Sequence, residues 1–392
     1  MNRGINLIAA AFALTALSYG LARFAYGLLL PQIRADLSFS ATTAGWIGSG
    51  AFTAYCLGIV FTFVGGRRFS PRAIAMLAGL AATFGMVLVA SASSALLLGL
   101  GIALAGLSSG LTSPPLASAV AQHFTDQDRP KANGAINAGT AAGIIFSGLA
   151  ALLAAGTWRE LYAVFALIGA GVTAWLWCAI PPSSGYQDHN RFSLAILKQP
   201  GLFTLCVSAF LMGLASTTIW TFGADILREN AGYTDSRIAW AWVALGAAGL
   251  CGSLTGNFVH RFGIRRVHGV SVGVMACAIA SLAWAFAAPA YGFAIMGGFG
   301  AAYIVSTGVY LIQGIRLLPE RPDLGLGIPF LVLALGQTVG APLFGTVLDA
   351  AGAHSALLMF AIAAGLALVI FPQTGEAQSA PARPDSALDR HP

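Results

Sequence analysis

Long apolar stretches recur along the whole 392-residue sequence, and short segments between them carry most of the charges. A helix needs about 20 apolar residues to cross a hydrocarbon core roughly 30 Å thick. Only 9% of the residues are charged, whereas a soluble domain typically carries roughly 25%. This chain cannot cover itself with a water-facing surface, so the sequence predicts an all-α integral membrane protein.

The apolar stretches predict twelve transmembrane helices in two groups of six. The first six are expected near 5–30, 43–64, 73–90, 95–121, 133–154 and 161–180. The others are expected near 201–224, 238–258, 269–287, 292–315, 326–348 and 355–372. A polar interruption at mid-chain predicts an N-terminal half (1–180), a cytoplasmic linker (181–200) and a C-terminal half (201–372). Residues 373–392 are rich in Pro, Ala, Ser and Asp, which predicts a disordered cytoplasmic tail.

The distribution of basic residues predicts how the helices are oriented. If the N-terminus is cytoplasmic, the cytoplasmic segments hold 15 of the 20 Lys and Arg residues. This asymmetry follows the positive-inside rule, so we expect both termini on the cytoplasmic side of a bacterial inner membrane. It also accounts for the net charge of +6 without nucleic acid as a partner, because basic clusters with interleaved aromatic residues are missing outside the short loops.

An internal repeat relates the two halves. A shift of 194 residues superimposes Trp46 on Trp240, Gly58 on Gly252, Arg67 on Arg261, Arg72 on Arg266 and Gly106 on Gly300. A shift of 197 residues superimposes Gly139, Gly143 and Gly148 on Gly336, Gly340 and Gly345. A nearly constant offset across several helices indicates that the halves are structural repeats.

Two parallel six-helix repeats resemble the major facilitator superfamily (MFS) over essentially the whole chain. The superfamily's loop motif, Gly-x-x-x-Asp-Arg-x-Gly-x-Arg-Arg, is similar to Gly256, His260, Arg261, Gly263, Arg265 and Arg266, with His260 replacing the aspartate. The first-half copy keeps Arg67, Arg68 and Arg72 but lacks the acid. The resemblance implies a gating role for these loops; their alternative role is to orient the protein by charge. The first helix, Tyr19 to Pro31, resembles the largely uncharacterised YbfB/YjiJ-type branch.

Arg23 lies inside the first apolar stretch, where an unpaired guanidinium is costly. Tyr19 and Tyr26, four residues before and three after, are expected on its helix face. Acidic residues are absent from the deep part of every predicted span, and Asp225 and Asp349 are expected to be solvated at helix ends. The alternative for Asp225 is a proton site, if the seventh helix extends further. A substrate anion is therefore the predicted partner, because arginine suits carboxylate or phosphate. The alternative is that Arg23 reaches the membrane interface or bonds a backbone carbonyl.

Further polar and aromatic residues are candidates for the same cavity. In the superfamily, helices 1, 4, 7 and 10 line a central cavity, and the resemblance implies the same here. The candidates on helices 4, 7, 10 and 11 are Ser109, Ser113, Thr217, Trp220, Tyr303, Thr307, Tyr310 and Gln337. For each one, a hydroxyl bonded within its own helix, or an aromatic ring filling the core, is an equal alternative.

The glycine faces of helices 5 and 11 predict close helix packing rather than an antiporter motif. They consist of Gly139, Gly143 and Gly148, and of Gly336, Gly340, Pro342 and Gly345. All six histidines are expected in loops or at helix ends, without the paired spacing of a metal site. The sequence therefore predicts that the protein binds neither a metal nor a cofactor and is not an enzyme.

These features predict a secondary transporter that works by alternating access, in which the two halves rock about a central site. We expect a small organic anion as substrate, a monomer in the lipid bilayer, and a proton or another ion gradient as an optional driving force. One alternative is efflux of drugs or metabolites through an adaptable aromatic cavity containing Phe24 and Trp220. A more remote one is a receptor or structural subunit that transports nothing.

Overall fold

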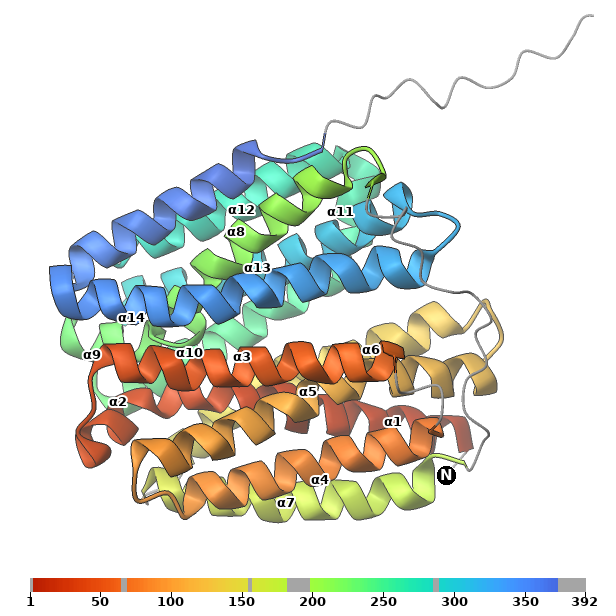
Figure 1. The fold of residues 1–392 in the computed structure, drawn as a ribbon, viewed down its shortest axis with the longest axis horizontal. Coiled ribbons are helices and arrows are strands. Elements are labelled where there is room, and N and C mark those ends of the chain that lie inside the picture. Colours follow the sequence, from red (N-terminus) through yellow and green to blue (C-terminus); the bar gives the residue numbers. More distant parts are fainter. Residues whose placement is uncertain (1–2, 65–68, 154–156, 182–197, 285–288, 373–392) are drawn as a thin grey trace, which may run out of the picture.

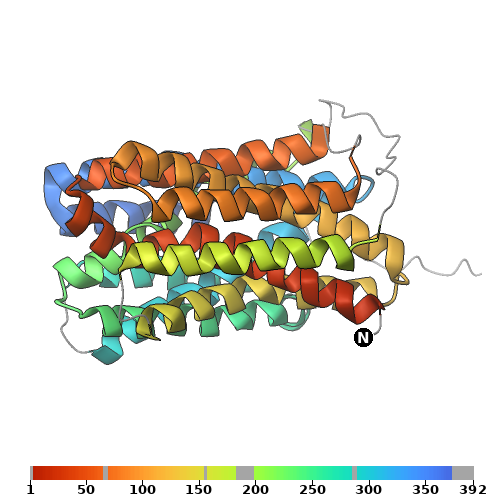
Figure 2. The same ribbon diagram turned by 90° about the horizontal axis from the view of Figure 1, so that it is seen from below.

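A computed structural model describes residues 3–64, 69–153, 157–181, 198–284 and 289–372. Most of the predicted linker and the whole predicted tail lie outside these ranges. The described residues are almost entirely helical, and strands are absent from them. The helices form two bundles, one from each half, which lie against one another with their axes roughly parallel (Figures 1 and 2).

The N-terminal bundle begins with one long helical segment and continues with five more helices. The segment consists of α1 (Arg3–Thr15), a π-helical stretch η1 (Ala16–Phe24) and α2 (Ala25–Leu37). The others are α3 (Ala41–Val64), α4 (Pro71–Ala90), α5 (Ala95–His123), α6 (Arg129–Leu153) and α7 (Trp158–Ala179). Side chains of Ser70, Ser94 and Thr157 cap the starts of α4, α5 and α7, which explains why these helices begin where they do.

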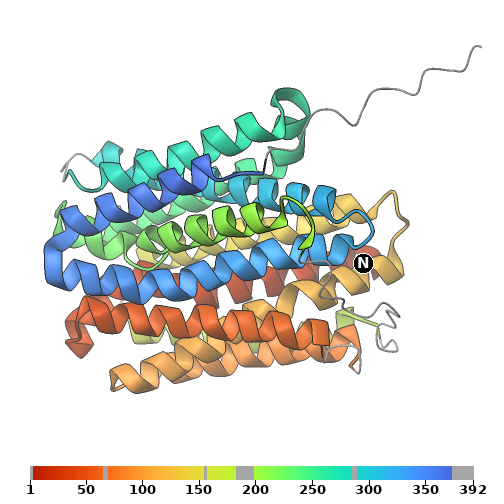
Figure 3. The ribbon, with the colours of Figure 1, turned by 45° about the horizontal axis from the view of Figure 1, so that its top comes forward.

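The C-terminal bundle has more interruptions. It contains α8 (Leu202–Trp220), the short α9 (Gly223–Glu229), α10 (Asp235–Gly249), a 3-10 turn η4 (Leu250–Leu254) and α11 (Thr255–Phe262). It ends with α12 (Ile264–Ser281), α13 (Pro289–Leu317) and α14 (Pro322–Val369). Figure 3 shows α14 turning back on itself, and the turn lies at Gly352, whose φ of 76° suits glycine.

The spans agree with twelve crossings. In the described part of the chain, ten helical segments are long and apolar enough to cross a membrane. One of them, α14, contains two of the predicted helices. Helix α12, which has Arg265 and Arg266 in its first turn, is not among the ten but corresponds to the ninth predicted helix. The first helix was predicted to end at residue 30, but it continues past Pro31 to Leu37. A transmembrane helix tolerates such a proline because neighbouring groups compensate for the lost hydrogen bond.

The outer surface is apolar, as lipid requires. Leu153, Leu167 and Phe203 are 86%, 74% and 77% exposed. Such side chains would be unfavourable in water but suit a hydrocarbon environment. The chain is therefore a membrane protein whose helices are surrounded by lipid.

The predicted glycine faces pack directly against neighbouring backbones. A Cβ atom added to Gly143 would overlap Ala16 of the first helix, and one added to Gly345 would overlap Ala41 of α3. The other members behave in the same way: Gly139 lies against Phe12, Gly148 against Ala239, Gly336 against Phe210 and Gly340 against Leu214. Close approach of this kind is what small residues provide between transmembrane helices.

Several helix pairs join the bundles, and two of them make the most extensive contacts. Helix α3 packs on α14, and α6 packs on α10. At the first pair, Gly45 faces the backbone of Ala341 and Pro342. We refer below to the far end, where α2 gives way to α3 and α14 turns at Gly352; it lies opposite the end marked N in Figure 1.

Candidate functional site

Arg23 lies buried between the two bundles and is only 7% exposed. Its Nη2 atom donates a hydrogen bond to Gln337 Oε1 at 2.9 Å. Its guanidinium carbon lies 4.2 Å from the ring centroid of Tyr55, 4.9 Å from that of Phe52 and 5.2 Å from that of Phe24. The charge is thus held by an amide oxygen and by aromatic rings, whose faces attract cations.

The backbone around Arg23 is π-helical from Ala16 to Phe24. Segments of this kind are rare and frequently occur at functional sites. Within the segment, Gly20 lies against the backbone of Gly143, so the first helix approaches α6 closely here. The π-helix therefore presents Arg23 from a stretch that packs tightly against α6.

Gln337 connects Arg23 to three helices of the C-terminal bundle. It lies on α14, and its Nε2 atom donates to Ser216 Oγ on α8 and to the Tyr303 hydroxyl on α13, at 3.2 Å each. The Arg23–Gln337 bond therefore links the first helix to a polar network of the opposite half.

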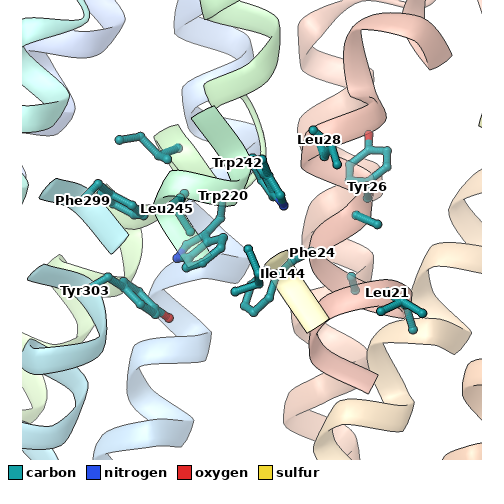
Figure 4. Close-up of a cluster of buried hydrophobic side chains, with 14 of the residues drawn as sticks. Leu21, Phe24, Tyr26, Leu28, Ile144, Trp220, Trp242, Leu245, Phe299 and Tyr303 are labelled. Atoms are coloured by element: carbon teal, nitrogen blue, oxygen red, sulfur yellow. The ribbon is translucent and has the colours of Figure 1, made fainter. Parts of the chain in front are cut away.

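Aromatic side chains form the apolar part of the site, shown in Figure 4. Trp220 stacks on Phe24 across the two bundles, with ring centroids 4.0 Å apart. The edges of Tyr303 and Phe299 also meet Trp220, with centroids at 5.1 and 5.6 Å. All four rings are buried, so they form a packed aromatic cluster beside Arg23.

Several predicted cavity hydroxyls bond within their own helices. Ser109 donates to Gly106 O, Thr217 to Leu214 O and Thr307 to Ile304 O, at distances of 2.7 to 2.8 Å. This is the alternative that sequence reasoning weighed equally for them. Tyr19 and Ser113 differ, because their hydroxyls bond to one another at 3.1 Å between the first helix and α5.

Two predicted site residues are engaged elsewhere. The Tyr26 hydroxyl donates to Ala44 O at 3.0 Å, so the side chain ties α2 to α3 instead of joining Arg23. The Tyr310 hydroxyl bonds to Ser208 at 2.8 Å inside the C-terminal bundle. Helical spacing alone does not fix where a side chain on a shared face finds its partner, and this corrects the prediction for both tyrosines.

Sequence reasoning missed Phe52, Tyr55 and Ser216. Phe52 and Tyr55 are three residues apart on α3, so they share a face. That signal was present in the sequence, but it is the same pattern that ordinary core residues show. Only the packing of α3 against the first helix gives these rings their role around Arg23.

The far end carries a second polar contact between the halves. Arg34 on α2 forms an ion pair with Asp225 on α9, and the side chains are 24% and 4% exposed. Sequence reasoning expected Asp225 to be solvated, which is wrong because α9 folds over the end of α8 and buries it. Burial raises the pKa of Asp225, an effect that the charge of Arg34 opposes.

Further hydrogen bonds close the far end. Asp349 on α14 accepts bonds from the amide and hydroxyl groups of Thr42 at 2.7 Å each. Deeper in the bundle, Ser49 donates to Thr338 O at 2.7 Å. A recess of about 390 Å³ remains at the surface, lined in part by Arg34, Asp225 and Asp349. In this structure the two halves are therefore tied together from the middle of the bundle to the far end.

The predicted gating residues that the structure describes lie at the opposite end. Arg67 and Arg68 are outside the described residues. The Arg72 guanidinium carbon lies 3.9 Å from the ring centroid of Trp177, and that of Arg261 lies 5.3 Å from Phe262. Gly263, with a φ of 82°, separates α11 from α12. The remaining members, His260, Arg265 and Arg266, are exposed.

The histidines do not assemble a metal site in the described ranges, where groups of three or more His, Cys, Asp or Glu residues are absent. The prediction that every histidine lies in a loop or at a helix end is wrong for His268, which is 1% exposed. Its ring stacks on Phe371 with centroids 4.0 Å apart. The reason is that α12 begins at Ile264, five residues earlier than predicted, so His268 falls inside the helix.

The fold and the site define a membrane transporter: two repeated helix bundles enclose one buried polar cluster at their interface. The sequence matches the Major Facilitator Superfamily over residues 12–315, and the chain belongs to that family. It is therefore a transporter of small molecules and not an enzyme. Its resemblance to the YbfB/YjiJ-type branch stays a prediction.

Solved structures share the fold. The crystal structure of the nucleoside transporter NupG matches with a TM-score of 0.75 and 14% identity, over 94% of this chain and 98% of that chain. A bacterial homologue of the human lysosomal transporter Spinster, inward-facing and unoccupied, matches with a TM-score of 0.72 and 16% identity, over 94% and 95%.

Relatives in sequence carry different names. The transcription regulatory protein OpdE of Pseudomonas aeruginosa is 26% identical over 367 residues, 88% of this chain and 87% of OpdE. The putative uncharacterized transporter YgaY of Escherichia coli K12 is 32% identical over 166 residues, 41% of each chain. The purine ribonucleoside efflux pump NepI of the same organism is 23% identical over 217 residues, 52% of this chain and 51% of NepI.

Proposed function

We propose that this protein is a secondary active transporter that carries a small organic anion by alternating access, with Arg23 as the anion-binding group. The observation behind this proposal is that a buried guanidinium at the interface of the halves bonds to a neutral amide. An ionised group in such a place is costly unless a counter-charge or strong hydrogen bonds compensate for it. A substrate carboxylate would supply that compensation.

Among the described residues, acidic side chains at the far end are engaged with other groups. Asp225 pairs with Arg34, and Asp36 pairs with Arg159 near the far end. The rings of Tyr55, Phe52 and Phe24 stabilise the cation without neutralising it, so the site keeps a positive charge. Arginine binds carboxylates through charge-assisted hydrogen bonds, often two in parallel. These facts support an organic anion with a carboxylate and a small apolar body.

The contacts between the halves support the alternating-access part of the proposal. The Arg34–Asp225 ion pair and the Asp349 bonds hold the far end closed, so the site would open toward the other end in this conformation. By the positive-inside rule, the far end is periplasmic and both termini are cytoplasmic in a bacterial inner membrane. This conformation would then be the one closed to the periplasm.

A second candidate substrate is a neutral nucleoside or another planar metabolite. The stacked rings of Trp220 and Phe24 and the neighbouring amide of Gln337 favour it, because planar bases stack on aromatic rings and bond to amides. The similarity to the purine ribonucleoside efflux pump NepI and to the nucleoside transporter NupG also favours this candidate. For such a substrate, the charge of Arg23 would be structural.

A ligand panel separates the two candidates. Purified protein is heated with monocarboxylates, nucleosides or organic cations, since a ligand that binds the folded state raises its Tm by mass action. The proposal predicts a shift with at least one monocarboxylate, and loss of that shift in Arg23→Gln. A shift confined to nucleosides, retained in Arg23→Gln, would favour the second candidate instead.

A further inference from the structure

The hydrogen bonds around Gln337 fix the direction of its amide. Ser216 donates its own hydroxyl hydrogen to Gly213 O at 2.7 Å, so it presents only lone pairs to Gln337. The group of Gln337 that faces Ser216 must therefore be the NH₂ donor. The carbonyl oxygen then faces Arg23, and the 2.9 Å contact is a bond from guanidinium to amide oxygen.

This arrangement positions Arg23 without neutralising it. We propose that Gln337 is a specificity-determining residue of the transport site: its neutral oxygen holds the place that a substrate carboxylate oxygen takes on Arg23. The inference rests on the proposed function of Arg23. When the substrate binds, the Nη2–Oε1 bond is exchanged for a bond to the carboxylate, and Gln337 stays attached to Ser216 and Tyr303.

The amide matters because a carboxylate of the same length would reverse the charge balance. Glutamate at position 337 would accept the same bond from Arg23 and form an ion pair with it. An incoming anion would then meet a site of zero net charge and would have to displace a charged partner. Glutamate would also lose the two bonds that the NH₂ group donates to Ser216 and Tyr303. Glutamine is thus the residue that leaves the positive charge available.

The exchange also connects binding to movement. In this structure the bond between Arg23 and Gln337 joins the first helix to α14, and so joins the two halves at mid-depth. A substrate that takes over Arg23 removes this direct bond and substitutes contacts of its own. Occupancy of the site therefore changes which groups connect the two halves at mid-depth. The contacts at the far end connect the halves in addition.

The test compares charge with shape at one position. Equilibrium binding of lactate, pyruvate and benzoate is measured for the wild type, Arg23→Gln, Gln337→Glu and Gln337→Met, each first checked for helical content and a single elution peak. Methionine has a similar length and no charge. We expect Gln337→Met to bind within a few-fold of the wild type, and Gln337→Glu to bind about 10- to 100-fold more weakly.

The outcomes separate the two proposals. If the wild type binds none of these anions, or if Arg23→Gln binds them equally well, the proposed function fails and this inference fails with it. If Arg23→Gln loses binding but Gln337→Glu keeps it, or if Gln337→Met loses as much as Gln337→Glu, only the inference fails. Should Gln337→Glu not fold, Ser216→Asp places a carboxylate beside the same amide, and the same weakening is expected.

Discussion

The two partners of the far-end ion pair, Arg34 and Asp225, differ in burial, so removing Arg34 should cost more free energy than removing Asp225. Asp225 is almost completely buried, with 4% of its side chain exposed. Replacing Arg34 by methionine would leave that carboxylate without its partner, and breaking a buried pair in this way costs about 3–5 kcal/mol. The unpaired carboxylate can instead take up a proton, which for an aspartate of ordinary pKa costs about 4 kcal/mol at pH 7. The loss of its partner therefore cannot cost more than this. We therefore expect Arg34→Met to destabilise the closed far end by about 3–4 kcal/mol.

The reverse change should be mild. Arg34 is 24% exposed, borders the far-end recess, and donates a second bond from Nε to Phe39 O at 3.3 Å. In Asp225→Asn the guanidinium keeps that bond and gains access to water, and no ionised carboxylate has to be buried, so the cost should be at most about 1 kcal/mol, typical of one hydrogen bond. The difference of about 2–3 kcal/mol corresponds to a roughly 30- to 150-fold change in the ratio of closed to open molecules.

Distances between spin labels measure that ratio. Labels at Ser40 and Asn230, exposed residues at the far end on opposite halves, should report mainly the short distance in the parent protein and in Asp225→Asn. In Arg34→Met a longer distance should dominate. If Asp225→Asn opens the far end as much as Arg34→Met, the reasoning from unequal burial is refuted.

Three other changes follow from the same contacts. Because burial raises the pKa of Asp225 in the closed form, closure is favoured at low pH and weakens as pH rises; the label distances should follow, and Asp225→Asn should abolish the trend. Gly143→Ala should lower stability by about 1–3 kcal/mol in thermal unfolding, whereas Gly171→Ala, with open space around it, should not. Tyr303→Phe should leave substrate binding within a few-fold of the wild type in titrations, because Gln337 keeps its bond to Ser216 and the charge of Arg23 is unchanged.

The sequence was sufficient for the architecture because each span carries its own signal. Apolar length located the helices, and the offset of 194 to 197 residues related the halves. The sequence also placed Arg23 in a buried span and identified Gln337 as a candidate site residue. The bond between them could not be predicted, since it joins residues 314 positions apart whose meeting depends on how the bundles pack.

Local irregularities in the helices caused the other differences between the predicted and the observed structure. The π-helix from Ala16 to Phe24 and the folding of α9 over the end of α8 leave no clear pattern in apolar periodicity. The first sets the surroundings of Arg23, and the second buries Asp225. Tyr26 and Tyr310 show the same limit, because a helix face can be predicted while the partner of a hydroxyl on that face cannot.

The central claim is that Arg23 binds the carboxylate of the transported solute. Proteoliposomes loaded with an unlabelled monocarboxylate that binds the purified protein are placed in the labelled compound, and its exchange across the membrane is measured. We predict rapid exchange by the wild type, and a loss of at least tenfold in both Arg23→Gln and Arg23→Lys, since lysine cannot supply the paired donors. Equal exchange by the wild type and Arg23→Gln would contradict the claim.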